Sequence, residues 1–103
     1  MTVTLENFLT PEMAAEANDY DCATGKGYRH PVGEPKPVPF RVGDGLTCLI
    51  NMGSGHQSPM AFKAGRSTVE LSAFYARNLK DDATAIPVFT SIANAVTARL
   101  TGR

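Results

Sequence analysis

The chain has 103 residues, 43% of them hydrophobic and 19% charged, and its ten basic and ten acidic side chains leave no net charge. This is the composition of a single globular domain, and a pI of about 6.7 lacks the general basicity of a nucleic-acid-binding protein. No apolar run approaches the roughly 20 residues that a membrane span needs. We therefore expect one soluble, cytoplasmic domain over residues 1–103, with neither nucleic acid nor membrane as a partner.

The first 21 residues form an acidic segment. They hold five carboxylates and no Lys or Arg, a charge of −5, so the other 82 residues, with ten basic and five acidic side chains, carry +5. Thr10-Pro-Glu12 is typical of a helix start and predicts a short helix over about 11–19. Residues 3–9 before it fit either an extended arm or a first helical turn. We expect this acidic helix to lie on a basic surface of its own or a neighbouring subunit; the alternative is an arm that binds a basic partner.

Residues 22–39 form a Pro/Gly-rich loop or arm. Three glycines and four prolines exclude a helix there and favour polyproline-like extension. A connection of this length is more often a binding loop or a subunit-wrapping arm than a plain linker. We therefore expect residues 25–39 to contact a partner, with Tyr28 and Arg29 as the anchors.

Residues 40–103 should form the compact core. Short apolar runs bounded by turn residues predict three antiparallel strands at about 39–43, 46–52 and 59–64, the last two joined as a hairpin through Gly53-Ser-Gly55.

Two helices should follow this sheet. Ser67-Thr-Val-Glu70 has capping-box spacing and predicts a helix over about 68–80, although a strand through Val69, Leu71, Ala73 and Tyr75 is the competing interpretation. Pro87 and an apolar stripe predict a last helix over about 87–101. The expected fold is thus α+β, a small sheet of about three strands covered on one face by two C-terminal helices.

The two cysteines give no metal or redox signature. Cys22 and Cys48 do not form a Cys-x-x-Cys pair, and we expect both to be free thiols. His30 and His56 each follow a cysteine after seven intervening residues, which is wider than the ligand spacing of structural zinc sites. No metal and no cofactor are expected.

Two polar loops contain the candidate binding residues, and no complete catalytic set accompanies them. The sequence around Ser54 lacks the first glycine of a nucleophile elbow, so a flexible hairpin tip is favoured. Gly25-Lys-Gly27 lacks the third glycine of a dinucleotide-binding loop and the Lys-Ser/Thr ending of a P-loop. The residues that these loops offer for binding are Lys26, Tyr28, Arg29, His30, Ser54 and His56.

The favoured function is a small non-enzymatic interaction protein, such as an assembly component, inhibitor or adaptor, that works through protein–protein contacts. Short strands leave open sheet edges, so self-association into a homo-oligomer is also expected. The alternative is a small-ligand-binding protein or small enzyme whose pocket, at a subunit junction, is built from loops 25–30 and 53–57.

Overall fold

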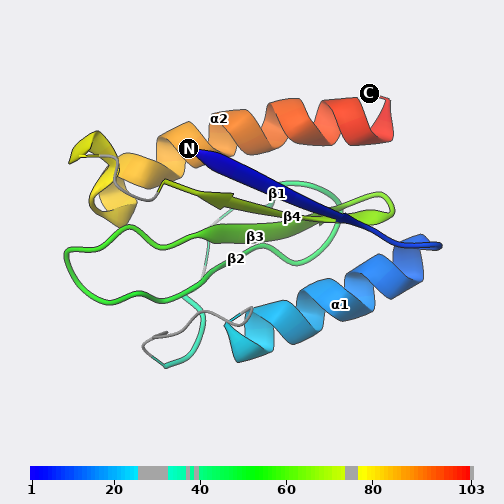
Figure 1. Ribbon diagram of the computed structural model, residues 1–103, viewed down its shortest axis with the longest axis horizontal. Coiled ribbons are helices and arrows are strands. Elements are labelled where there is room, and N and C mark those ends of the chain that lie inside the picture. The colour runs from blue at the N-terminus through cyan, green and yellow to red at the C-terminus, as the bar shows by residue number, and fades with distance from the viewer. Residues whose placement is uncertain (26–32, 37, 39, 74–76, 103) are drawn as a thin grey trace.

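The computed structural model describes residues 1–25, 33–36, 38, 40–73 and 77–102. In chain order the elements are β1 (Thr2–Asn7), α1 (Pro11–Thr24), β2 (Cys48–Leu49), β3 (Met60–Ala64), β4 (Ser67–Ser72), a short 3₁₀ helix η1 (Arg77–Leu79) and α2 (Asp82–Thr101). The strands form one antiparallel sheet in the order β1-β4-β3-β2. Helices α1 and α2 lie on opposite sides of this sheet (Figure 1). The prediction of an α+β fold with a small antiparallel sheet is confirmed.

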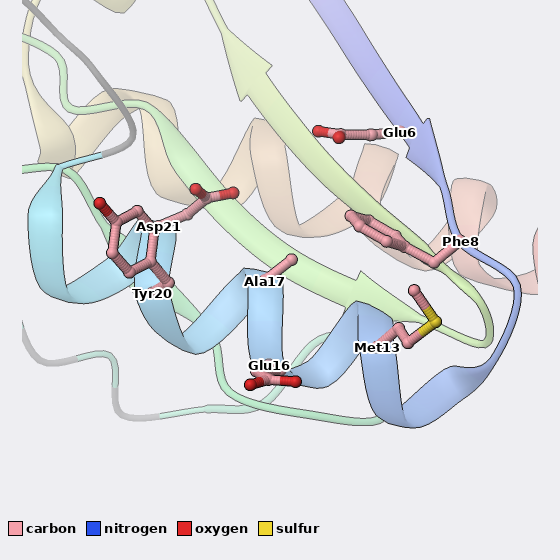
Figure 2. Close-up of a pocket in the computed structure, with 7 residues that line it drawn as sticks. All are labelled: Glu6, Phe8, Met13, Glu16, Ala17, Tyr20 and Asp21. Atoms are coloured by element: carbon pink, nitrogen blue, oxygen red, sulfur yellow. The ribbon is translucent and has the colours of Figure 1, made fainter.

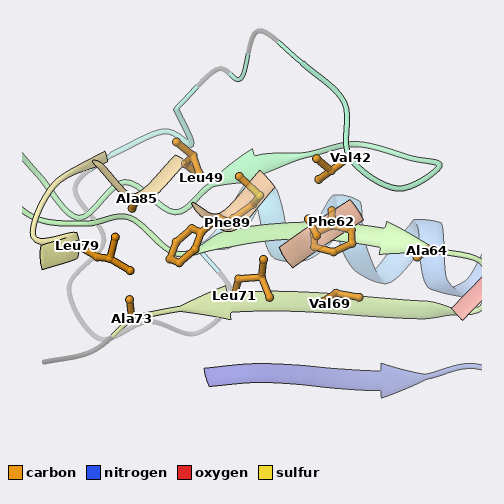
Figure 3. Packing of buried hydrophobic residues seen from close by; sticks show 12 residues of the cluster. Val42, Leu49, Phe62, Ala64, Val69, Leu71, Ala73, Leu79, Ala85 and Phe89 are labelled. Carbon is orange, nitrogen blue, oxygen red and sulfur yellow. The ribbon is translucent and has the colours of Figure 1, made fainter. Parts of the chain in front are cut away.

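The main core lies between the sheet and α2. Phe62 on β3 and Val69 and Leu71 on β4 are fully buried, and they belong to one cluster with Phe89 and Ala93 of α2 (Figure 3). Alternate residues of a strand point to opposite faces, so the other face of β3 presents Ala61 to a second cluster with the two cysteines. All five residues of β3 are buried, which makes it the central strand of the fold.

Residues 67–72 form strand β4, so the prediction of a helix over about 68–80 is wrong and the competing strand interpretation is correct up to Ser72. Gly65 adopts a left-handed φ of 60° in the tight turn that joins β3 to β4. The Ser67 hydroxyl bonds the side-chain Oδ1 of Asn7 in β1, at 2.6 Å, instead of capping a helix. Of the predicted strand at 39–43, the described residues 40–43 are not in a strand, and the one predicted at 46–52 is shortened to β2.

The first and last helices fit their predictions, with shifted ends. α1 extends to Thr24 and is closed by Gly25, which has a left-handed φ of 79°. α2 begins five residues earlier than predicted because the Asp81 side chain accepts a hydrogen bond from the Thr84 amide at 3.0 Å, a good N-cap. Pro87 therefore lies inside α2 rather than at its first turn. In the described part of the chain, no helix is both long and apolar enough to cross a membrane.

Cys22 of α1 and Cys48 of β2 form a disulfide, so the prediction of two free thiols is wrong. The packing of α1 on the sheet brings the two Cα atoms to 6.0 Å, a distance that their separation of 26 residues does not reveal. The bond closes a covalent loop that contains the Pro/Gly-rich segment. One end of that segment is held by the fold, since the Lys36 amide donates to the Leu49 carbonyl at 3.0 Å and Val38 packs on the core.

Candidate interaction surface

Strand β1 is the open edge of the sheet. It pairs with β4 on one side, and all six of its residues are exposed, with Val3 at 43% and Leu5 at 48%. The opposite edge strand, β2, has only two residues, and Lys36 forms a bridge with its Leu49. Natural proteins protect exposed edges with Lys, Pro, bulges or short strands. β1 contains no Lys or Pro and is three times as long as β2, so it is the less protected edge.

The hydrogen-bond pattern indicates which backbone groups of β1 point outward. The Phe8 amide donates to the Arg66 carbonyl at 2.8 Å, which continues the β1–β4 ladder beyond Asn7. In antiparallel pairs, hydrogen-bonded and non-hydrogen-bonded residues alternate. Since Phe8 bonds inward, the N–H and C=O groups of Val3, Leu5 and Asn7 are directed to the free edge. An added strand would find its main-chain partners there.

An apolar groove separates β1 from α2. We call it the α2-side groove; its volume is about 330 Å³. The β1 side chains in it are Val3 and Leu5, which share the sheet face that α2 covers. Arg99 is its only charged lining residue among the residues that the structure describes. The full lining is Val3, Leu5, Ile92, Ala95, Val96, Arg99 and Leu100.

A second groove of about 500 Å³ lies between the other face of β1 and α1, and we call it the α1-side groove (Figure 2). Its apolar part includes Met13 and Tyr20, which are 45% and 69% exposed. Within the described residues that line it, every charged side chain is a carboxylate. The full lining is Glu6, Phe8, Met13, Glu16, Ala17, Tyr20 and Asp21. β1 therefore separates an apolar groove from one that combines apolar and acidic side chains.

Of the predicted binding residues, the two that the structure describes, Ser54 and His56, line neither groove. Ser54 and His56 are exposed in the loop between β2 and β3, where the His56 amide donates to the Gly53 carbonyl at 3.4 Å. Lys26, Tyr28, Arg29 and His30 lie outside the described residues. Convergence of loops 25–30 and 53–57 on one pocket therefore stays a prediction.

One polar cluster with the residue types of a catalytic site is better explained by packing. Asp82, the first residue of α2, accepts hydrogen bonds from the Ser58 amide at 2.6 Å and hydroxyl at 3.2 Å, and pairs with Lys36 at 2.5 Å. Ser58 is only 1% exposed and its hydroxyl is already bonded to this carboxylate. The cluster joins two loops to the positive end of α2, a stabilising arrangement for a carboxylate. The hydroxyl of the cluster, on Ser58, is therefore buried and not exposed to a substrate.

Asp44 closes a similar structural contact on the other side of the sheet. It pairs with Lys63 at 2.6 Å and accepts from the Gly65 amide at 2.8 Å. Burial raises the pKa of Asp44, but the hydrogen bonds from Lys63 and Gly65 outweigh it and hold this pKa below its ordinary value of 3.8. Elsewhere in the described chain, no three His, Cys, Asp or Glu side chains are grouped so that they could hold a metal ion.

No family model, curated protein or solved structure matches this chain. Its function has to be inferred from the surface itself. Sites for small molecules usually bury most of the ligand. Both grooves beside β1 are open to solvent, and among the described residues no strand pairs with the edge of β1 that lies between them. This shape suits an extended polypeptide better than a small molecule.

Proposed function

We propose that the protein is a small non-enzymatic interaction protein that binds another polypeptide by adding a strand to the β1 edge. The main support for this proposal is that all six residues of the edge strand β1 are exposed, including the aliphatic side chains of Val3 and Leu5, which are about half exposed. Main-chain hydrogen bonds supply affinity in strand addition, and pockets for alternate side chains supply specificity. β1 has both features, because outward backbone groups lie between two grooves.

The bound polypeptide belongs either to another protein or to a second copy of this chain. A homo-oligomer was expected from open sheet edges, and β1 is where that contact would form. Sequential strand addition at one edge satisfies the backbone groups that a monomer leaves to water.

The disulfide gives information about the cellular compartment of the protein. The expectation of a cytoplasmic protein assumes that both cysteines are free thiols. Disulfides form and persist mainly in oxidising compartments. A buried bond between α1 and β2 therefore favours folding under oxidising conditions over the cytoplasm.

The test is an edge-blocked variant, Val3→Lys with Leu5→Lys. Both side chains are exposed, so the fold should tolerate lysine, while charge on an edge strand opposes strand addition. The matched control is Leu46→Lys with Val88→Lys, which makes the same change at residues that are 48% and 39% exposed and line neither groove. Each protein is photo-crosslinked in an extract of its native cells, and the crosslinks are mapped by mass spectrometry.

The proposal expects crosslinks at residues 1–8 that the control retains and the edge-blocked variant loses. Sedimentation velocity of the purified proteins shows in parallel whether the partner is a second copy. Crosslinks that survive the edge block unchanged would refute binding at β1.

A further inference from the structure

We infer that the strand bound at β1 alternates apolar and basic residues, so that its apolar side chains enter the α2-side groove and its Lys or Arg side chains enter the α1-side groove. This inference rests on the proposed function, because it specifies the occupant of the same edge. Two observations support it. Successive side chains of a strand point to opposite faces of the sheet, and the grooves on the two faces of β1 differ in charge.

Apolar side chains of the bound strand are required on the sheet face that α2 covers. Residues opposite one another on neighbouring antiparallel strands point to the same face of the sheet. Incoming residues opposite Val3 and Leu5 would therefore lie in the α2-side groove, against the partly buried Ile92 and Val96. Aliphatic side chains there remove Val3 and Leu5 from water, and a charged one would be desolvated without a carboxylate among the described lining residues.

The basic requirement comes from the opposite face. Incoming residues next to Thr4 and Glu6 would point into the α1-side groove, whose lining includes Glu6 and Glu16. Lys and Arg can lay their aliphatic stems on Phe8 and Met13 while the charged head stays near a carboxylate. The exposed ring of Tyr20 offers a further cation contact (Figure 2).

A second copy fits only one of the two grooves. Two β1 strands centred on Thr4 would place each Val3 opposite the other copy's Leu5, which suits the α2 side. The same pairing places Glu6 of each copy on the acidic face of the other. Each copy's β1 adds one carboxylate side chain and no cationic side chain to the other copy's α1-side groove, and like charges brought together there are unfavourable. A different chain with basic residues at alternate positions satisfies both faces.

The test uses three blocked synthetic hexapeptides on the full-length, disulfide-bonded protein. The first is Val-Lys-Val-Lys-Leu-Lys; the second replaces each Lys with Glu; the third, Lys-Lys-Lys-Val-Val-Leu, keeps the composition and removes the alternation. Affinity is measured by fluorescence anisotropy and the binding position by amide NMR. The alternating basic peptide should bind about tenfold more tightly than either other peptide, since a few cross-strand pairs differ in each case. Its largest amide shifts should fall at Val3, Leu5 and Asn7.

Two further variants isolate the charge contribution. Glu6→Gln with Glu16→Gln should weaken binding of the alternating basic peptide by about threefold to tenfold, because each exposed ion pair contributes little alone. Glu12→Gln with Glu34→Gln is the matched control, since it removes the same number of charges at two exposed acids that line neither groove. Added salt should reduce the difference between the paired variant and the control.

The possible failures point to different conclusions. If the acidic peptide binds β1 as tightly as the basic one, or if β1 self-associates and the peptides do not compete, this inference is wrong and strand addition at β1 stands. If peptide shifts map away from residues 1–8 and the native crosslinks also survive the edge block, both the inference and the proposed function are wrong.

Discussion

Removing the Cys22–Cys48 disulfide should cost a large share of the stability of the fold. The bond closes a loop between residues 26 apart, for which chain-entropy arguments give about 3.5 kcal/mol. A domain of this size is typically stable by only about 5–15 kcal/mol. The melting temperature should therefore fall by roughly 15–25 °C in the double variant Cys22→Ala, Cys48→Ala. Alanine is chosen because both cysteines are buried, at 3% and 4% exposure, and serine would bury a hydroxyl.

The assay is urea unfolding followed by far-UV circular dichroism, with and without a thiol reductant. Reductant should destabilise the wild type by an amount close to the effect of the double variant, and should leave the double variant unchanged. If reductant does not change the urea midpoint of the wild type, or if the double variant loses less than about 1 kcal/mol of unfolding free energy, the disulfide does not stabilise the fold as argued.

Substitutions at three other sites, with Gly55→Ala as a control for the first, should lower the stability of the fold. Gly43→Ala should lower the free energy of unfolding by about 3 kcal/mol or more, because the new Cβ would lie 2.0 Å from the Lys63 carbonyl oxygen. Gly55→Ala is the control: this residue also has a positive φ, but nothing lies within 4 Å of the new Cβ, so the loss should be about 1–2 kcal/mol in the same urea assay. Asp82→Ala should lower the free energy of unfolding by about 2–3 kcal/mol in the urea assay, since it leaves the buried Ser58 amide without an acceptor and its hydroxyl with only the long bond from the Met52 amide, at 3.4 Å. Asp44→Asn should lower the melting temperature above pH 3.8, and the difference should vanish as acid protonates the wild-type carboxyl, because a pKa lowered by folding stabilises only the ionised form.

The sequence predicted the class of fold but misassigned the strand that completes the sheet. Ser67 and Glu70 have capping-box spacing, yet Val69 and Leu71 also alternate with polar residues as in a strand. The choice depends in part on a partner far away in the chain, since β4 pairs with the neighbouring β3 on one side but with residues 2–7 on the other. The β1–β4 pairing spans 60 to 70 residues and leaves no local signal in the sequence of β4. Local capping at Thr10 and Asp81, by contrast, depends on neighbouring residues, and Thr10 was identified correctly.

Only part of the candidate surface could be predicted from the sequence, because the rest depends on contacts between residues distant in the chain. The −5 charge of residues 1–21 could be read directly, and so could the alternative that they bind a basic partner. The extended arm considered for residues 3–9 contains most of β1, but nothing local shows that its outer edge remains unpaired. The grooves need α1 and α2 on opposite faces of the sheet, whereas the prediction covered one face with the C-terminal helices and assigned the N-terminal helix to neither face. The disulfide likewise depends on packing that brings α1 to β2.

The position of the helices explains why β1 remains available for binding. Both α1 and α2 contact β3 and β4, the middle of the sheet, so all five residues of β3 are buried while all six of β1 are exposed. β1 thus completes the hydrogen bonds of β4 but contributes little to the core. Val3 and Leu5 gain only part of the stabilisation that full burial gives an aliphatic side chain, and the polar residues usual on an exposed edge would pair with β4 equally well. Under the proposed strand addition at β1, these two aliphatic side chains would gain the burial that the isolated domain does not give them.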